Sequence, residues 1–322
     1  MAKDTETALD AQSGGDGALE IREDEHGTRR AFLKLAGAAA AATAAVAATG
    51  CGSTAPTTEE FLRQHYKKLS AEEKQRIFAR IEEETKARTG VTTHISDPPP
   101  LDGVEYAYAL NLSVCNGSRR CVEACARENN LPDDPEIRYI RVFEMEAGSL
   151  EFEEATPYYA HENLPAKDKY YMPVQCHQCD NPPCVKACPV QATWKEPDGI
   201  VVVDYSWCIG CRFCVVACPY FARRFNWVQP DIPPDRINPN QGYLSNRPRF
   251  KGVVEKCTFC LHRTRKGRLP ACLEACPTGA RKFGNVLDPN SEVAYILKNK
   301  RVFIQLKEEM GTSPRFFYYF DV

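Results

Sequence analysis

The stretch that decides the fold is CIGCRFCVVACP, residues 208–219. Its four cysteines have the spacing Cys-x2-Cys-x2-Cys-x3-Cys, and a proline follows the last one. In this spacing the first three thiolates wrap around one iron–sulfur cluster, and the fourth points away and binds a neighbouring cluster. Pro219 ends the loop because its ring fixes φ and it has no amide hydrogen to donate. The run therefore predicts a cluster-binding loop that works as one of a pair.

Fifteen of the sixteen cysteines fall into four groups of this kind. The second group, CHQCDNPPCVKACP at 176–189, has two additional residues before its third cysteine. The fourth, CTFC…ACLEACP at 257–277, has a longer middle gap but keeps the last spacing and the proline. The first, CNGSRRCVEAC at 115–125, has only three cysteines, with Ser118 at the expected second position.

Structural zinc and disulfide bonds are the competing interpretations of clustered cysteines. Four cysteines can bind zinc, but zinc sites rarely use the Cys-x2-Cys-x2-Cys-x3-Cys-Pro spacing. Disulfides would suit an exported protein, but cysteines two or three residues apart in one loop have poor geometry for a bond, and fifteen is an odd number. Iron–sulfur clusters are therefore the favoured interpretation.

The fourth cysteine of each group predicts which groups share clusters, because it crosses to the neighbouring site. Only residues 189–207 separate the second and third groups, which is close to the spacing in a small two-cluster ferredoxin, so we expect these two groups to pair. The first and fourth groups then pair around this inner unit. The expected ligand sets are Cys176, Cys179, Cys184 and Cys218; Cys208, Cys211, Cys214 and Cys188; Cys125, Cys257, Cys260 and Cys272; and Cys115, Cys121 and Cys276 with Ser118 beside them.

Ser118 makes the last of these sets unusual. Neutral serine is a poor iron ligand because its hydroxyl is hard to ionise, whereas three thiolates suit a 3Fe–4S cluster, which lacks one corner iron. A 4Fe–4S cluster completed by serine or water, and an empty or labile site, are the alternatives. The expected cofactors are three 4Fe–4S clusters and one 3Fe–4S or atypical 4Fe–4S cluster, and loss of the corner iron generally raises the potential.

Residues 1–50 resemble a twin-arginine signal peptide. TRRAFLK at 28–34 contains the arginine pair, and a weakly apolar, alanine-rich run follows over 35–49. This route exports folded proteins, which suits a protein whose clusters are inserted in the cytoplasm. Cys51 follows a loose lipoprotein cleavage pattern at 48–50, but an ordinary cleavage site at 45–47 is the alternative. We expect the protein in the periplasm or on the outer face of the cytoplasmic membrane.

The rest of the sequence does not favour a membrane-spanning protein, a nucleic-acid-binding protein or an enzyme. No other stretch approaches the ~20 apolar residues of a spanning helix. A net charge of −2 does not indicate the basic surface that nucleic-acid-binding proteins have. No convincing nucleophile, glycine-rich phosphate loop or acid–base pair is recognisable, so we expect a carrier of electrons rather than an enzyme, with no small-molecule substrate of its own.

The expected fold class is α+β, with two pseudo-symmetric ferredoxin-like two-cluster units, inserted loops and a preceding helical arm. After the signal peptide we expect an arm and linker (51–100), the first half of an outer unit (101–170), an inner unit (171–250), the second half of the outer unit (251–290) and a C-terminal strand and tail (291–322).

Local patterns predict the elements inside these segments. Residues 57–89 are expected to form a helix with a capping box at 70–73 and a glycine stop at 90, and the prolines at 98–100 mark a linker. Short helices are expected after each crossing cysteine, and an irregular proline-rich insertion at 226–250. Strands are expected at 106–112, 138–144, 169–174, 200–205 and 252–255.

Three further features have two interpretations each. The aromatic C-terminal run is expected in the core rather than at a docking surface. His177, Trp194 and Trp207 are expected to pack and hydrogen-bond near the ligands rather than to act as ligands or electron relays. The basic stretch 263–268 is interpreted as a solvated loop.

The four groups, together with DGIVVVDYSWCIGCRFCVVACPYFARRFNW at 198–227 and KGVVEKCTFC at 251–260, resemble the electron-transfer subunit of the complex iron–sulfur molybdoenzymes. Dimethyl sulfoxide, polysulfide, tetrathionate and nitrate reductases have such a subunit, as do related quinol-oxidising complexes. The resemblance covers residues 101 to about 290. It implies an electron-transfer path of four clusters held by two ferredoxin-like units. It also implies two partners, a molybdopterin-containing catalytic subunit and a polytopic quinone-reacting membrane subunit.

Ser118 departs from the family, in which a non-cysteine position usually belongs to a different group. The alternative function is a free periplasmic ferredoxin-like carrier that is not held in a complex. A free carrier would gain little from the arm at 57–89 or from the proline-rich insertion, so the complex is the favoured interpretation.

Overall fold

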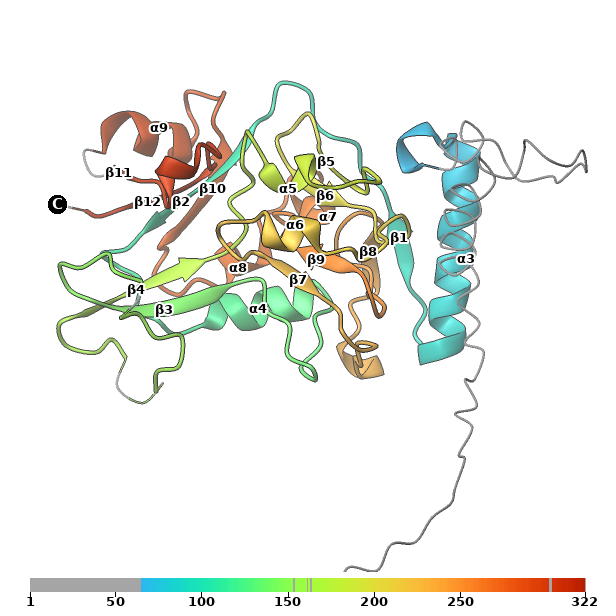
Figure 1. Ribbon diagram of the computed structural model, residues 1–322, viewed down its shortest axis with the longest axis horizontal. Helices are drawn as coiled ribbons and strands as arrows, with labels where there is room; N and C mark the ends of the chain where they lie inside the picture. Colours follow the sequence, from blue (N-terminus) through green and yellow to red (C-terminus); the bar gives the residue numbers. More distant parts are fainter. Residues whose placement is uncertain (1–64, 153, 161, 163, 301–302, 322) are drawn as a thin grey trace, which may run out of the picture. The chain divides into compact units, whose positions relative to one another are not determined.

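The structure is a computed structural model that describes residues 65–152, 154–160, 162, 164–300 and 303–321 (Figure 1). The predicted export signal, Cys51 and the first residues of the predicted arm lie outside the described residues. Within the described residues, no helix combines the length and the apolar composition that a membrane-spanning segment needs.

The main sheet has four strands in the order β10-β2-β12-β11. Its strand β2 (Tyr106–Asn111) is buried at every position, so it lies inside the core. It runs antiparallel to β10 (Arg281–Asn285) and parallel to β12 (Phe316–Tyr319). The short β11 (Phe303–Ile304) pairs with the other side of β12. This sheet therefore joins segments that are far apart in the chain.

The described residues form four further sheets of two strands each. They pair β3 (Arg141–Glu146) with β4 (Lys169–Val174), β5 (Thr193–Lys195) with β6 (Val201–Val203), β7 (Arg223–Phe225) with β9 (Val254–Lys256), and β1 (His94–Ser96) with β8 (Asn240–Gly242). The first three pairs are antiparallel and the last is parallel. The fold is thus a mixed arrangement of helices and small sheets, in line with the α+β prediction, and the pseudo-symmetry and the segment boundaries stay predictions.

The predicted strands are present with small changes in their bounds. β4 has the predicted bounds, and β2 ends one residue early. The segments predicted at 138–144, 200–205 and 252–255 form β3, β6 and β9, which are shifted or shorter. The aromatic C-terminal run lies in the core, because Phe316 and Tyr318 of β12 are fully buried. The prediction of a core position for this run is confirmed.

In the three groups that have four cysteines, a short helix lies before the fourth cysteine. α5 (Pro183–Lys186), α6 (Phe213–Val216) and α8 (Ala271–Glu274) each end just before that cysteine, so the prediction of helices after it is wrong. The three-residue spacing is one helical turn, which places the helix inside the motif, and the chain beyond the proline becomes a strand. The first group lacks the proline, and there α4 (Arg120–Glu128) continues past the last cysteine.

The fourth group contains a further short helix, α7 (Leu261–Thr264), in its long middle gap. Outside the cysteine groups, the described residues also form α9 (Glu292–Asn299) and the short 3-10 turns η1 (Tyr66–Lys68), η2 (Pro234–Arg236) and η3 (Glu308–Met310), besides the arm helix.

The arm helix α3 (Ala71–Thr89) begins well after the predicted residue 57. Its start has the predicted capping box. The Glu73 amide donates to Ser70 Oγ at 3.2 Å, and the Ser70 amide donates to the Glu73 carboxylate at 2.7 Å. The helix ends at Gly90, whose φ of 74° is the left-handed conformation that glycine adopts readily. Both predicted end signals are confirmed.

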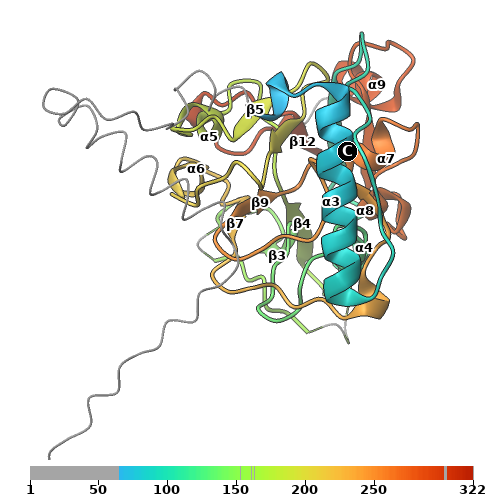
Figure 2. The same ribbon diagram turned by 90° about the vertical axis from the view of Figure 1, so that its right-hand side faces the viewer.

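The arm is held against the proline-rich insertion. Phe78 of α3 packs on Tyr243 with ring centres 5.2 Å apart, and Tyr66 stacks on the same ring at 5.0 Å. β1 follows α3 and pairs with β8 of the insertion, and α3 packs beside β1 (Figure 1). Figure 2 shows α3 along its length on the side that faces the viewer. The insertion is otherwise mostly irregular, as predicted. The described part of the arm is therefore a packing element of the fold.

The interpretation of residues 263–268 as a solvated loop is wrong for the first half of that stretch. Arg265 is buried, and its Nε donates to Asp198 Oδ2 at 2.7 Å while its Nη1 donates to the Pro98 carbonyl at 3.0 Å. Arg263 is also buried and pairs with Glu128 at 2.8 Å. These partners come from other segments, so the local run of basic residues could not reveal them.

Arg265→Met is expected to lower the free energy of unfolding by about 3–5 kcal/mol, because it leaves the fully buried Asp198 carboxylate without its partner. Guanidinium-induced unfolding of the full chain, followed by circular dichroism, measures the loss. Arg268→Ala, at an exposed position of the same stretch, should change this free energy by less than about 0.5 kcal/mol. Equal losses in the two variants would contradict the role given to Arg265.

Candidate iron–sulfur centres

Side chains from the first and fourth cysteine groups line one cavity. They include Cys115, Cys121, Cys276 and Ser118. Cys121 lies in α4 and Cys276 follows α8, so the packing of these two helices brings the two groups together. Ser118 is half-buried at this cavity, and its amide donates to Asn116 Oδ1 at 3.2 Å. The structure thus places the predicted three thiols and the serine around one space.

The loop that carries Ser118 has a fixed path. Gly117 has a φ of +73°, and a Cβ on it would lie 2.5 Å from the Tyr171 ring. Only glycine fits there, because a side chain would be strained in this conformation and would overlap the ring. The Gly117 carbonyl also accepts a hydrogen bond from the Tyr159 hydroxyl at 2.7 Å. These contacts hold Ser118 at the cavity.

A second cavity lies between the second and third groups. Its cysteines are Cys176, Cys179, Cys184 and Cys218. Cys184 lies in α5 and Cys218 follows α6, and these two short helices pack together. Burial, and then repulsion from the Cys176 thiolate, raise the pKa of the Cys179 thiol to about 12. Such thiols lose their protons when a metal ion replaces the proton, so they suit metal binding.

The third predicted set is deeply buried. Its members, with exposed fractions of 4–7 %, are Cys125, Cys257, Cys260 and Cys272. The Asn129 Nδ2 lies 3.5 Å from Cys125 Sγ and 3.8 Å from Cys260 Sγ, so thiols of the first and fourth groups face the same amide. Burial raises the pKa of all four thiols, and repulsion from other members of the set adds to the shift of Cys125, Cys257 and Cys260. The structure brings these four residues together.

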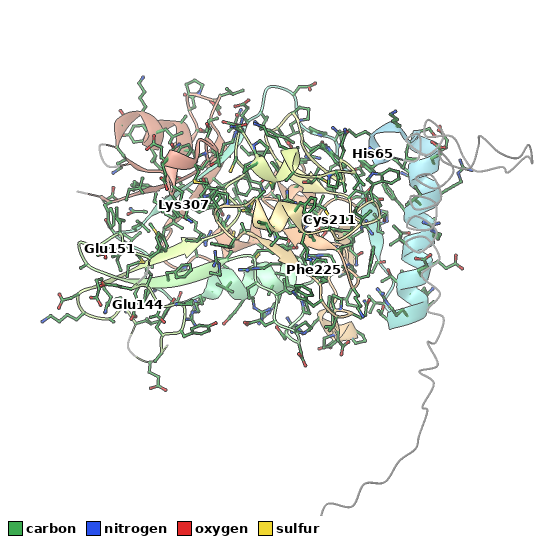
Figure 3. The ribbon with its side chains drawn as sticks, in the orientation of Figure 1. His65, Glu144, Glu151, Cys211, Phe225 and Lys307 are labelled. Atoms are coloured by element: carbon green, nitrogen blue, oxygen red, sulfur yellow. The ribbon has the colours of Figure 1, made fainter. Side chains whose placement is uncertain are left out.

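The remaining predicted set is brought together only in part. It consists of Cys188, Cys208, Cys211 and Cys214. Burial raises the pKa of the Cys214 thiol to about 11, the Arg223 guanidinium opposes the shift, and the Cys208 thiolate adds to it. Cys211 lies near Phe225 in Figure 3, and the guanidinium of the next residue, Arg212, lies 5.3 Å from the centre of the Phe225 ring. The membership of Cys188 and Cys211 in this set stays a prediction.

The donors fit iron–sulfur clusters. None of the fifteen described cysteines is in a disulfide. Among the residues that the structure describes, no three His, Cys, Asp or Glu side chains converge as the ligands of a single ion do. In an iron–sulfur cluster each thiolate binds a different iron, so the thiolates stand around a wider space. The two cysteine-lined cavities have this arrangement.

The aromatic residues near the cysteines pack and form hydrogen bonds, as predicted. Burial lowers the pKa of His177 to about 3, so its ring is neutral at pH 7, and its Nε2 lies 3.3 Å from the Tyr318 hydroxyl. Trp207 donates to a backbone carbonyl at 2.7 Å. Trp194 stacks on a tyrosine that precedes α3, with ring centres 5.9 Å apart. These contacts favour a supporting role over a role as ligands.

Two buried arginines contact the cysteines, and the sequence reasoning missed both. Arg223 Nη2 donates to Cys184 Sγ at 3.1 Å, and Arg281 Nη2 donates to Cys121 Sγ at 3.5 Å. Burial would lower the pKa of each guanidinium, but the nearby thiolates outweigh it and raise the pKa. Both arginines end a repeated motif, Cys-Pro-x-x-Ala-Arg, and this repeat is the signal that could have found them.

The chain is similar to known iron–sulfur proteins. Residues 167–232 and 244–286 match the 4Fe-4S dicluster domain family. The chain is 42% identical over 211 residues to the Hdr-like menaquinol oxidoreductase iron-sulfur subunit 1 of Archaeoglobus fulgidus, and the match covers 62% of this chain and 71% of the relative. It is 39% identical to a selenate reductase subunit of Mesobacillus selenatarsenatis, over 68% of this chain and 73% of the relative.

A third relative supports the same grouping. The iron-sulfur cluster-binding subunit of the menaquinone reductase of Nitratidesulfovibrio vulgaris is 37% identical over 67% of this chain and 88% of its own length. The dicluster match and the cysteine count together support several 4Fe–4S clusters. Because these relatives are named as subunits of reductase complexes, the chain belongs to the family of 4Fe–4S dicluster iron–sulfur subunits of multisubunit reductases, whose members transfer electrons rather than catalyse the terminal reaction.

Proposed function

We propose that this chain is exported by the twin-arginine route and relays single electrons between a quinone-reacting membrane subunit and a molybdopterin-containing catalytic subunit. The observation that carries the proposal is the presence of four cysteine groups. The second, third and fourth groups lie within the segments that match the 4Fe-4S dicluster domain, and two of the predicted ligand sets line separate cavities. When bound, each cluster supplies one-electron redox chemistry. The chain's own residues bind the irons and set the surroundings of the sulfur atoms.

The cysteines of the four predicted sets would hold the irons as thiolates. Buried neutral donors stand beside them. The Tyr108 hydroxyl is 3.2 Å from Cys272 Sγ, and Gln175 Nε2 is 4.0 Å from Cys257 Sγ. Hydrogen bonds to sulfur favour the more negative, reduced state and so raise the potential. Because both donors are at most 1% exposed, water does not replace them.

The set with Ser118 would hold a 3Fe–4S cluster. Three thiols and the serine line its cavity, and the fixed Gly117 loop leaves the serine where a fourth ligand would stand. A neutral hydroxyl binds iron poorly, so the fourth corner is the one expected to lack its iron. Three 4Fe–4S clusters would occupy the other sets.

Ser118→Cys tests this assignment, because it supplies the missing thiolate at a position that already faces the cavity. The native protein should contain about fifteen irons and show an oxidised 3Fe–4S signal in low-temperature EPR. The variant should lose this signal and gain about one iron.

Ser118→Ala is the matched control, since it removes only the hydroxyl. It should leave the 3Fe–4S signal unchanged. About sixteen irons in the native protein, without that signal, would instead indicate a fourth cubane completed by serine or water, and about twelve would indicate an empty site.

The partners are testable by purification of the native assembly. An affinity tag on the full chain should recover a molybdenum-containing protein and a polytopic membrane protein in constant ratio, and quinol should reduce the iron–sulfur centres of that assembly. Native electrophoresis, molybdenum analysis and EPR measure these outcomes. A monomer that carries its clusters but recovers neither partner would support a free carrier in place of a complex subunit.

The export route depends on the arginine pair at 29–30. Changing both arginines to lysine should retain the protein in the cytoplasm, because the twin-arginine pathway reads this pair. Cell fractionation and immunoblotting measure the distribution. Lys34→Arg is the control and should be exported normally. Normal export of the double variant would contradict the proposed route.

A further inference from the structure

The two arginines of the Cys-Pro-x-x-Ala-Arg motifs occupy equivalent places. The motifs are CPYFAR at 218–223 and CPTGAR at 276–281. In each, the arginine is the first residue of a strand, β7 or β10, and only 3% of it is exposed. Their hydrogen-bond acceptors are thiol sulfurs, a threonine hydroxyl and a glutamine carbonyl, and none of these is a carboxylate. A guanidinium buried in this way needs another source of negative charge.

Arg281 contacts two different predicted sets with one guanidinium. Its Nη2 donates to Cys121 Sγ at 3.5 Å, and Cys121 belongs to the set with Ser118. Its Nη1 lies 3.9 Å from Cys272 Sγ, and Cys272 belongs to the deeply buried set. The same Nη1 donates to Gln175 Oε1 at 2.8 Å, which fixes the guanidinium between the two sulfurs.

Arg223 has the corresponding position between the other two sets. Its Nη2 donates to Cys184 Sγ at 3.1 Å and to Thr193 Oγ1 at 2.9 Å. Its guanidinium also forms a hydrogen bond with the Cys214 thiol, which belongs to the neighbouring set. Its Nε and Nη1 are buried without a hydrogen-bond partner among the described residues, so the fork has donors left for further sulfur acceptors.

We propose that Arg223 and Arg281 are bridging arginines, each of which places one positive charge between two neighbouring clusters and raises the reduction potentials of both. The guanidinium stays protonated at any physiological pH. Taking up an electron makes a cluster more negative, so a nearby positive charge favours the reduced form, and the attraction is strong at a site that excludes water. One charge shared by two clusters also weakens the repulsion between them when both are reduced. The inference rests on the proposed ligand sets.

The planar fork explains why arginine is needed. Its five N–H groups point in fixed, divergent directions, so Nη1 and Nη2 can serve sulfurs of two sets at once. A lysine ammonium is a compact point charge on a flexible stem, and it would remain near one sulfur only. Charge and bridging can therefore be separated by substitution.

Arg281→Gln and Arg223→Gln test the proposal in the purified native assembly. Redox titration followed by low-temperature EPR gives a midpoint potential for each cluster. Arg281→Gln should lower the potentials of the two clusters held by the first and fourth groups and leave the other two unchanged. Arg223→Gln should lower the other two, so each variant is a control for its counterpart. Arg268→Gln removes the same charge from an exposed position and should move none of them.

The lysine variants test the bridging itself. Arg281→Lys should lower the potential of the cluster that loses its donor and move its neighbour less than Arg281→Gln does. If a glutamine variant does not assemble its clusters, the lysine variant tests the proposal in its place. Unchanged midpoint potentials of both neighbouring clusters in the lysine variant would overturn the proposal. So would a shift of only one potential in Arg281→Gln at full iron content. Native protein without clusters would instead refute the proposed function, and iron and sulfide counts separate the two failures.

Discussion

Thiols from distant parts of the chain have to meet in one place, and the rest of the structure depends on this constraint. Cys276 lines a cavity with Cys115, although the two lie at opposite ends of the cluster-binding region. The register of the main sheet explains how they meet. Because Leu110 of β2 pairs with Arg281 of β10, the chain leaves β2 toward Cys115 at the same end at which it enters β10 from Cys276. Backbone pairing in the sheet thus fixes the spacing of the sulfur ligands.

Buried arginines serve two purposes in this protein. Arg265 and Arg249 face carboxylates, Arg249 through its Nε at 2.5 Å from Glu255, and they fasten segments of the fold to one another. Arg223 and Arg281 face sulfur instead, so their charge is balanced by the metal sites and not by the fold. The nature of the partner separates structural arginines from those that act on the redox centres.

The sequence predicted the parts of the fold that local chemistry determines. The cysteine groups, the Ser70 capping box and the bounds of β4 follow from spacing, hydrogen bonding or alternation within a few residues. The positions of the short helices were missed because a single turn has no periodicity to detect. The burial of Arg265 was missed because its partner Asp198 comes from another segment. The two arginines of the Cys-Pro-x-x-Ala-Arg motifs were within reach, since the motif is repeated in the sequence, but only the fold shows what they contact.

The place of β2 in the main sheet has a consequence for the synthesis of the chain. Both of its neighbours, β10 and β12, come much later in the sequence, although β2 is buried at every position in the finished protein. At roughly 5–20 residues per second, the ribosome needs on the order of ten seconds or more to reach β12 after completing β2. For most of that time β2 has neither of its partners, because β10 is completed only shortly before β12. The nascent chain therefore passes through a stage in which β2 is open to wrong pairing, and it must be shielded by other proteins or by transient contacts until the last strand arrives.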